Sequence, residues 1–102
     1  MDRYLVVFTP EAEAQLEALY HHLAVEGFPQ VAARYVDAVI DHCEKLELFP
    51  VRGLLRDDIR PGLRLTNYRK HTIIAFTIEA DRVVIVGVFH GGQNYEAALA
   101  DE

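Results

Sequence analysis

Cationic side chains cluster in the middle of this chain, where they could bind a negatively charged group. Most Lys and Arg residues fall between positions 52 and 70, whereas the first half of the chain is rich in Asp and Glu. The cluster consists of Arg52, Arg56, Arg60, Arg64, Arg69 and Lys70. On a chain of net charge −6, this pattern reflects either ordinary scatter of surface charge or a local site for an anionic partner.

Two further side chains downstream could take part in a reaction. His90 ends an apolar run, and an imidazole with its ordinary pKa of about 6.5 can exchange a proton near neutral pH. Tyr95 carries a phenol that could act as an acid. The structural alternative for His90 is a histidine at a strand end, and for Tyr95 it is an aromatic anchor for the tail. Arg64 could instead be an outward strand arginine paired with Asp57 or Asp58.

The sequence lacks the residue spacings that other kinds of catalytic or metal-binding site require. The histidines do not form an HExxH pattern, and no Cys/His pairs have the spacing of a zinc site. The single cysteine, Cys43, falls on an apolar helical stripe, where a buried thiol is the expected role. No glycine-rich phosphate-binding loop precedes a helix. We therefore expect no metal ion and no cofactor.

The strand expected over residues 83–90 is the element around which the fold is organised. This run is β-branched or aromatic and carries no charge before its final histidine, which is typical of a strand rather than a helix. Strict alternation would place Val83, Ile85, Gly87 and Phe89 on one face and the intervening residues on the other. Both faces are apolar, so we expect a central strand that is covered on both sides.

Upstream, the pattern predicts a strand followed by a helical hairpin. Residues 4–8 have the β-branched and aromatic composition of a strand, and a Thr-Pro pair then marks a helix start. Apolar residues at helical spacing predict helices over residues 10–26 and 29–48, separated by two residues. A connection this short places the two helices antiparallel.

The second half of the chain has the pattern of a three-strand meander. Strands are predicted over residues 63–66, 72–78 and 83–90, with a loop over 51–61 and a short helix or frayed tail over 94–100. The resulting order, β-α-α-β-β-β, is an α+β fold in which the helical hairpin packs on one face of an antiparallel sheet.

Length, composition and charge limit the remaining possibilities. At 102 residues and 51% hydrophobic, the chain is expected to form one domain over residues 1–102 with a single core. No apolar run reaches the ~18 residues of a membrane span. The N-terminus does not resemble a signal peptide, so a cytoplasmic location is expected. The acidic balance argues against binding to bulk nucleic acid, which favours basic surfaces.

Several short motifs in this chain, taken together, resemble a known family. They are Phe8-Thr9-Pro10-Glu11-Ala12 at the start of the first helix, Ala32-Ala33-Arg34-Tyr35 and Leu46-Glu47-Leu48-Phe49-Pro50 in the second, Arg60-Pro61-Gly62-Leu63-Arg64 before the meander, and Val88-Phe89-His90-Gly91-Gly92-Gln93-Asn94-Tyr95-Glu96 at its end. Their order and spacing resemble the RelE/ParE family of bacterial toxins from type II toxin–antitoxin modules, and ParE more closely than RelE. The resemblance implies a helical hairpin on one face of an antiparallel sheet, with the C-terminal segment of an antitoxin wrapped around the toxin.

The resemblance to ParE implies a protein that acts by binding. Members of this kind bind DNA gyrase and trap it in a DNA-cleaved state, and a ParD-like antitoxin neutralises them in a hetero-oligomer. Nucleic acid would then be contacted only indirectly, and no membrane is involved. The residues expected to contact the target or the antitoxin are Arg56, Arg60, Arg64, Arg69, His90 and Tyr95.

The alternatives are an RNA-cleaving enzyme and an inactive antitoxin-binding module. RelE-like members cleave messenger RNA on the ribosome, which requires a base, an acid and cations around the scissile phosphate. Arg64 matches the strand arginine that such enzymes place near that phosphate, and His90 and Tyr95 are further candidates. The acidic, lysine-poor composition favours the binding toxin, as does Gln93, where many relatives carry arginine.

The apolar second face of the sheet predicts a partner. The helical hairpin covers one face only, and a tail as short as residues 94–102 is expected to cover little of the other. Exposed apolar area beyond a few hundred Å² marks an interaction site, so an extended or helical partner segment should lie there. We expect the chain alone to be poorly soluble or to self-associate, and its antitoxin to stabilise it.

Overall fold

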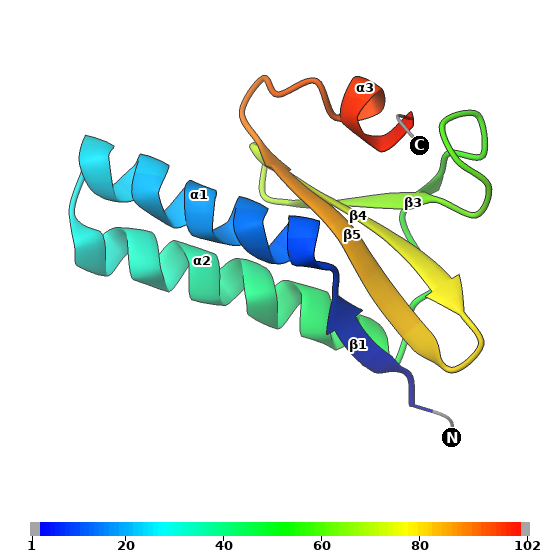
Figure 1. The fold of residues 1–102 in the computed structure, drawn as a ribbon. Helices are drawn as coiled ribbons and strands as arrows, with labels where there is room; N and C mark the ends of the chain where they lie inside the picture. Colours follow the sequence, from blue (N-terminus) through cyan, green and yellow to red (C-terminus); the bar gives the residue numbers. More distant parts are fainter. Residues whose placement is uncertain (1–2, 101–102) are drawn as a thin grey trace.

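The computed structural model describes residues 3–100, in which two helices pack against a sheet. In chain order the elements are β1 (Leu5–Phe8), α1 (Pro10–Glu26), α2 (Pro29–Glu44), the 3-10 helix η1 (Lys45–Glu47), β2 (Leu54–Leu55), β3 (Arg64–Tyr68), β4 (Thr72–Glu79), β5 (Arg82–His90) and α3 (Tyr95–Ala100). The strands lie in the order β1-β5-β4-β3-β2. The predicted α+β class, with a helical hairpin on one face of the sheet, is confirmed (Figure 1).

The sheet is mixed rather than purely antiparallel. β1 pairs in parallel with β5, so that Leu5 lies opposite Arg82 and Phe8 opposite Ile85. The β2–β3, β3–β4 and β4–β5 pairs are antiparallel, as expected for strands joined by short connections. The helical hairpin and three further strands separate β1 from β5 in the chain, so no turn sets their relative direction. The expectation of a purely antiparallel sheet is therefore wrong at the β1 edge.

Local sequence signals account for the helical hairpin. The Thr9 hydroxyl oxygen accepts a hydrogen bond from the Ala12 backbone N–H at 3.1 Å, and Pro10 occupies the first turn of α1. Only two residues separate α1 from α2, and the two helices pack along each other (Figure 1). The predicted end of the second helix at residue 48 is corrected, because the α-helix stops at Glu44 and a tighter 3-10 turn continues to Glu47.

The segment expected to be a loop over residues 51–61 contains the short strand β2. Leu54 pairs with Leu65 of β3, and Leu55 pairs with Arg64. Gly53 precedes this strand with a positive φ of 78°, and a Cβ at that position would collide with the Leu65 carbonyl oxygen. Only glycine allows the backbone to approach β3 this closely.

β5 contains a bulge that the alternation pattern does not reveal. Ala75 of β4 lies opposite Gly87, whereas the next residue, Phe76, lies opposite Ile85. Val86 is therefore an extra residue in the ladder. An extra residue exchanges the faces of the side chains that follow it. The strict alternation expected for this strand is wrong beyond Val86.

The exchange decides which side chains face the helices. Val88 joins Val83 and Ile85 in the core beneath α1 and α2, and the His90 ring lies beside Tyr35 of α2. Phe89 packs instead in a second cluster on the opposite face. The bulge thus turns the final histidine of the strand toward the helices.

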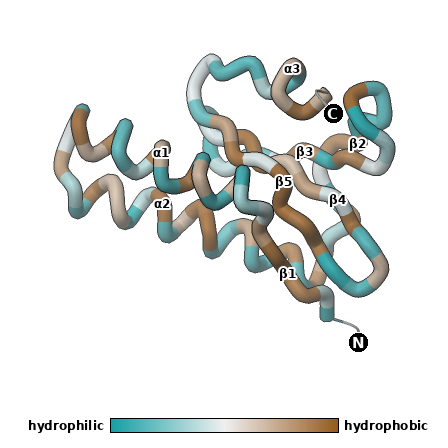
Figure 2. Tube along the Cα trace, viewed as in Figure 1, coloured by the Kyte–Doolittle hydropathy of each residue, from teal (hydrophilic) through white to brown (hydrophobic). Residues whose placement is uncertain are grey.

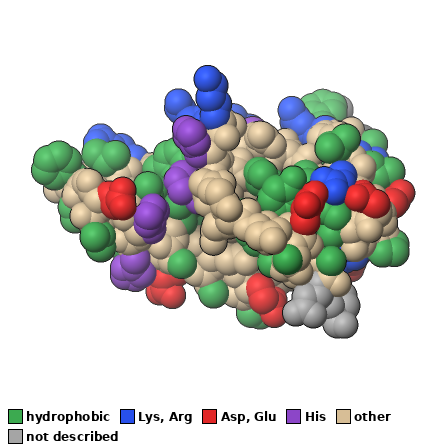
Figure 3. Space-filling model, turned by 90° about the horizontal axis from the view of Figure 1, so that it is seen from above, with side chains coloured by type: hydrophobic (Ala, Val, Ile, Leu, Met, Phe, Trp, Pro, Cys, Tyr) green, Lys and Arg blue, Asp and Glu red, His purple; other side chains and the backbone are tan. Residues whose placement is uncertain are grey.

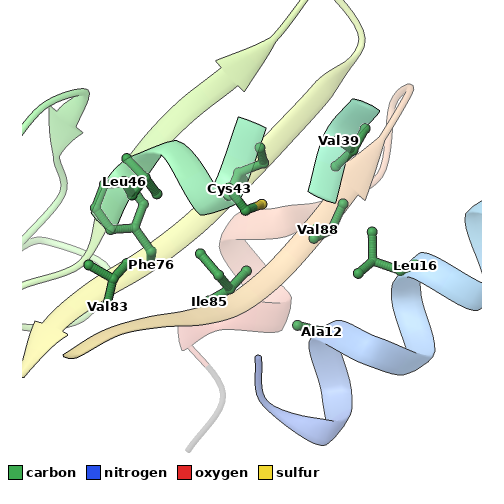
Figure 4. Close-up of a cluster of buried hydrophobic side chains, with 10 residues drawn as sticks. Ala12, Leu16, Val39, Cys43, Leu46, Phe76, Val83, Ile85 and Val88 are labelled. Carbon is green, nitrogen blue, oxygen red and sulfur yellow. The ribbon is translucent and has the colours of Figure 1, made fainter. Parts of the chain in front are cut away.

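Two hydrophobic clusters occupy the two faces of the sheet. The cluster on the helix side (Figure 4) contains Ala12, Leu16, Val39, Cys43, Leu46, Ile74, Phe76, Val83, Ile85 and Val88. Burial raises the pKa of the Cys43 thiol to about 12, as expected for a structural cysteine. The opposite cluster contains Leu63, Leu65, Ala75, Phe89 and Leu99. Because Leu99 belongs to α3 and is only 3% exposed, the tail covers more of this face than expected from its length.

Apolar side chains remain exposed at the margins of the fold. Leu5 on the edge strand β1 is 62% exposed, and Figure 2 shows hydrophobic segments along β1 and β5. Val25 and Phe28 are exposed at the tip of the helical hairpin, and Phe49 and Val51 are exposed after η1. Within the described part of the chain, no helix is long and apolar enough to cross a membrane.

We expect Gly87→Ala to destabilise the fold through the bulge. A Cβ at this position would lie 2.5 Å from the Phe89 ring, and that ring is buried against α3. Overpacking of this kind costs about 1–3 kcal/mol, which chemical denaturation monitored by circular dichroism can measure. Gly92→Ala is the matched control, because a Cβ there meets no atom within 4 Å. Equal stability of the two variants would contradict the close approach.

Candidate functional site

The three residues considered for catalysis lie apart. Arg64 lies opposite Phe76 of β4, whereas His90 lies opposite Thr72. These β4 positions are about 13 Å apart, at roughly 3.3 Å per residue. The Tyr95 ring packs on the opposite face of the sheet, with its centroid 6.2 Å from that of Phe89. The fold therefore does not bring Arg64, His90 and Tyr95 around one reacting group.

Two arginines of the cationic cluster hold the C-terminal helix. Arg56 forms 2.9 Å ion pairs with Asp58 and with Glu96 of α3, and these hydrogen bonds raise its pKa. The same arginine lowers the pKa of Asp58. Arg60 donates from its guanidinium to the Leu99 backbone carbonyl at 2.9 Å. Both side chains thus connect the loop before β3 to α3.

The other two arginines predicted to bind a partner are less constrained. Arg64 does not pair with the nearby aspartates, and its guanidinium makes a long 3.4 Å contact with the Arg52 carbonyl oxygen. Arg69 lies in the exposed β3–β4 turn with a positive φ of 57°. Its guanidinium donates to the Tyr68 hydroxyl and lies 5.4 Å from the centre of that ring.

The His90 ring is held by a chain of hydroxyl groups that the sequence did not indicate. Its Nδ1 atom lies 3.0 Å from the Thr72 hydroxyl, which in turn lies 2.7 Å from the Tyr35 hydroxyl. Thr72 is fully buried, so this contact fixes the orientation of the imidazole. His22 of α1 and His71 of the β3–β4 turn flank it, with ring centroids 6.2 and 6.3 Å from that of His90.

A cavity of about 410 Å³ opens beside His90, between α1 and the end of β5. It is lined by Gln15, Ala18, Leu19, His22, Val88, His90, Gly91, Gly92 and Gln93. Its lining contains two histidines and no carboxylate, although the whole chain is acidic. Figure 3 shows histidine side chains following one another across this side of the molecule. Among the residues that the structure describes, no group of histidine, cysteine or acidic side chains is arranged to hold a metal ion.

A comparison with known protein families agrees with the family resemblance expected from the sequence. The family model described as "ParE toxin of type II toxin-antitoxin system, parDE" matches residues 6–95. The chain belongs to this family. It is therefore a toxin of the RelE/ParE group from a type II toxin–antitoxin system. The match spans the strands, both long helices and the start of the tail, so it covers every element that builds the site.

Individual relatives of this ParE-family chain are distant in sequence. Toxin ParE3 of Caulobacter vibrioides is 24% identical over 94 residues, which cover 92% of this chain and 93% of that protein. The chromosomal ParDE toxin–antitoxin structure from P. aeruginosa has a TM-score of 0.76 and 23% identity, covering 87% of this chain and 97% of its own. The RelBE2 toxin–antitoxin complex from Mycobacterium tuberculosis has a TM-score of 0.61 and 24% identity, covering 91% and 97%. At these identities the solved structures support the fold.

The histidine beside the cavity should make this ParE-family fold sensitive to acid. Burial, then the nearby His22 and His71, lower the pKa of His90 below its ordinary value of 6.5. The unfolded chain therefore binds more protons between the folded and unfolded pKa values. The stability contributed by neutral His90 is complete above pH 6.5 and is lost as the pH falls through the folded pKa.

We expect the melting temperature to decrease as the pH is lowered from 7.5 to 5.5, and less steeply in His90→Gln. Differential scanning calorimetry over this range measures both slopes. An equal slope in the wild type and in His90→Gln would assign the acid sensitivity to other groups. One such group is His42, whose pKa is also lowered by burial and by Arg52 and Lys45.

Proposed function

We propose that this chain is a ParE-like toxin that binds DNA gyrase, traps it in a DNA-cleaved state and performs no chemistry of its own. A ParD-like antitoxin would hold it inactive. The observation that carries the proposal is the separation of Arg64, His90 and Tyr95, because catalysis requires acid, base and cation around one phosphate. The match to the ParE family over residues 6–95 supports the same function.

The second candidate is a RelE-like enzyme that cleaves messenger RNA on the ribosome. The fold similarity to the RelBE2 toxin–antitoxin complex supports this second candidate. Three features argue against it. The net charge is −6, and Arg56 and Arg60 are engaged with the tail. Gln93 supplies no cation, and its side-chain oxygen accepts a hydrogen bond from the His90 backbone N–H. Few cations are thus left near a bound phosphate.

An antitoxin would find apolar surface at the margins of the sheet. The P. aeruginosa ParDE structure and the M. tuberculosis RelBE2 structure both come from toxin–antitoxin systems. Leu5 and the exposed leucines of β2 offer apolar contacts at the two edges of the sheet. Arg64 and Arg69 could pair with acidic residues of that partner and would mainly increase the association rate. Arg56 and Arg60 would act indirectly, by holding α3 in place.

We expect the purified chain to leave RNA intact, both free and bound to ribosomes. The physical reason is that Arg64 and His90 lie opposite β4 residues that are about 13 Å apart, too far to act on one phosphate. Primer-extension mapping of a translated message, with the wild type and Arg64→Ala in parallel, measures cleavage. Specific cleavage by the wild type that disappears in Arg64→Ala would establish the enzymatic alternative.

A further inference from the structure

The strand β2 forms an open edge of the sheet. It is the last strand in the order β1-β5-β4-β3-β2, and within the described part of the chain it pairs with β3 alone. The Arg56 backbone N–H donates to the Leu63 carbonyl at 2.7 Å, which continues the β2–β3 ladder by one residue. Because backbone groups alternate along a strand, the Leu54 N–H points toward β3, whereas the Leu55 N–H and C=O point away from the sheet.

Apolar side chains surround this edge. Val51, Leu54 and Leu55 are all exposed. Leu54 and Leu55 are consecutive residues of one strand, so their side chains lie on opposite faces of the sheet. Proteins usually protect an edge strand with a charged side chain, a proline or a covering element. The two leucines that make up β2 provide neither a charge nor a proline.

The charges that flank β2 complement those of a second copy of the same segment. Arg52 precedes the strand and Asp57 and Asp58 follow it, and all three are exposed. In an antiparallel pair centred on Leu55, Arg52 of one copy lies beside the two aspartates of the other, and two-fold symmetry repeats the contact. Asp58 is already paired with Arg56, so Asp57 is the main counter-charge. A parallel pair would place like charges together, which is unfavourable.

We propose that two copies of this chain associate through β2, with the two strands antiparallel about a two-fold axis. The Leu55 N–H of each copy would donate to the Leu55 carbonyl of the other, which joins the two five-stranded sheets into one. The exposed apolar side chains at this edge bury roughly a few hundred Å² per copy, less than the ~800 Å² per partner of a standard interface. The dimer is therefore weak, with a dissociation constant that is micromolar or higher.

This association is separate from the proposed binding of gyrase. Two strands, β3 and β4, separate β2 from β5, so the interface lies about 14 Å from the strand that borders the cavity beside His90. The antitoxin is the competing occupant of this edge, because the exposed leucines of β2 are open to it as well.

Sedimentation equilibrium of the purified chain tests the dimer. Between roughly 5 and 500 µM protein, the weight-average mass should rise from that of one chain toward that of two. Leu55→Lys places two like charges opposite each other and should raise the dissociation constant about tenfold or more. Leu5→Lys is the matched control, because it makes the same change at an exposed leucine on the other edge of the sheet. A monomer at every concentration, or equal weakening by the two variants, would overturn the proposal.

Amide hydrogen exchange locates the interface in the wild type. The Leu55 N–H should exchange about five- to tenfold more slowly at the highest protein concentration, the effect of gaining one hydrogen bond. The Arg56 N–H, which is bonded to the Leu63 carbonyl within the same chain, is the internal control and should not change. If the Leu55 N–H gains protection only when the antitoxin encoded beside this gene is added, the edge binds the antitoxin and the dimer is wrong.

Discussion

Phe76→Ala is expected to lower the free energy of unfolding by about 3–5 kcal/mol, the usual cost of deleting a buried aromatic ring. Phe76 is fully buried and is among the largest side chains in the helix-side cluster. It lies on β4 and packs in that cluster with Leu46 of η1 and Val83 of β5 (Figure 4). Its loss therefore removes contacts between the sheet and the end of the helical hairpin at the same time.

The loss is large because domains of this size have little stability in reserve. Total unfolding free energies are about 5–15 kcal/mol, so Phe76→Ala should remove a fifth or more of the total. Urea denaturation followed by circular dichroism measures the change. Val25→Ala is the control, because Val25 is 86% exposed at the hairpin tip and should change stability by less than about 0.5 kcal/mol. Similar midpoints for the two variants would contradict the described core.

The helical hairpin could be predicted because its signals are local. The Thr9 cap, Pro10 and the two-residue connection lie next to the elements that they define, and the structure confirms them. The long strands were placed within about two residues for the same reason. The direction of β1 was not predictable in this way, because its partner β5 lies at the other end of the chain.

The bulge in β5 is a second feature that could not be predicted from the sequence. A run such as Val83 to Val88 is apolar on both faces, so the pattern contains no mark of where the alternation is interrupted. The interruption at Val86 becomes visible only through the pairing with β4. It decides that Val88 and His90 face the helices, and therefore where the cavity lies.

The candidate site depended on contacts between distant residues. Arg56 was expected to bind a partner, yet it pairs with Glu96, which lies 40 positions later. Gln15 was not singled out, although it caps the Val88 N–H from 73 positions earlier. A glutamine on a helix carries no local signal for such a role, since the same residue is common on solvated helical faces. The fold class could thus be predicted from local sequence pattern. The cavity beside His90 depends instead on packing between residues that are distant in the chain.

Trapping of DNA gyrase is the second large effect that we expect, because the proposed toxin acts by binding rather than by catalysis. Added to gyrase and supercoiled plasmid in the presence of ATP, the purified chain should convert plasmid to linear DNA after detergent and protease treatment. Preincubation with the antitoxin should abolish the effect, since the partner would cover the toxin surface. The wild-type chain, denatured by heat before it is added, serves as the inactive control.

Gyrase trapping is tested most directly by running that assay beside ribosome-dependent RNA cleavage with one protein preparation. We expect linear DNA that depends on both gyrase and the chain, with the translated message left intact. Cleaved message with unaffected gyrase would contradict gyrase trapping and would assign the chain to the RNA-cleaving branch of its family.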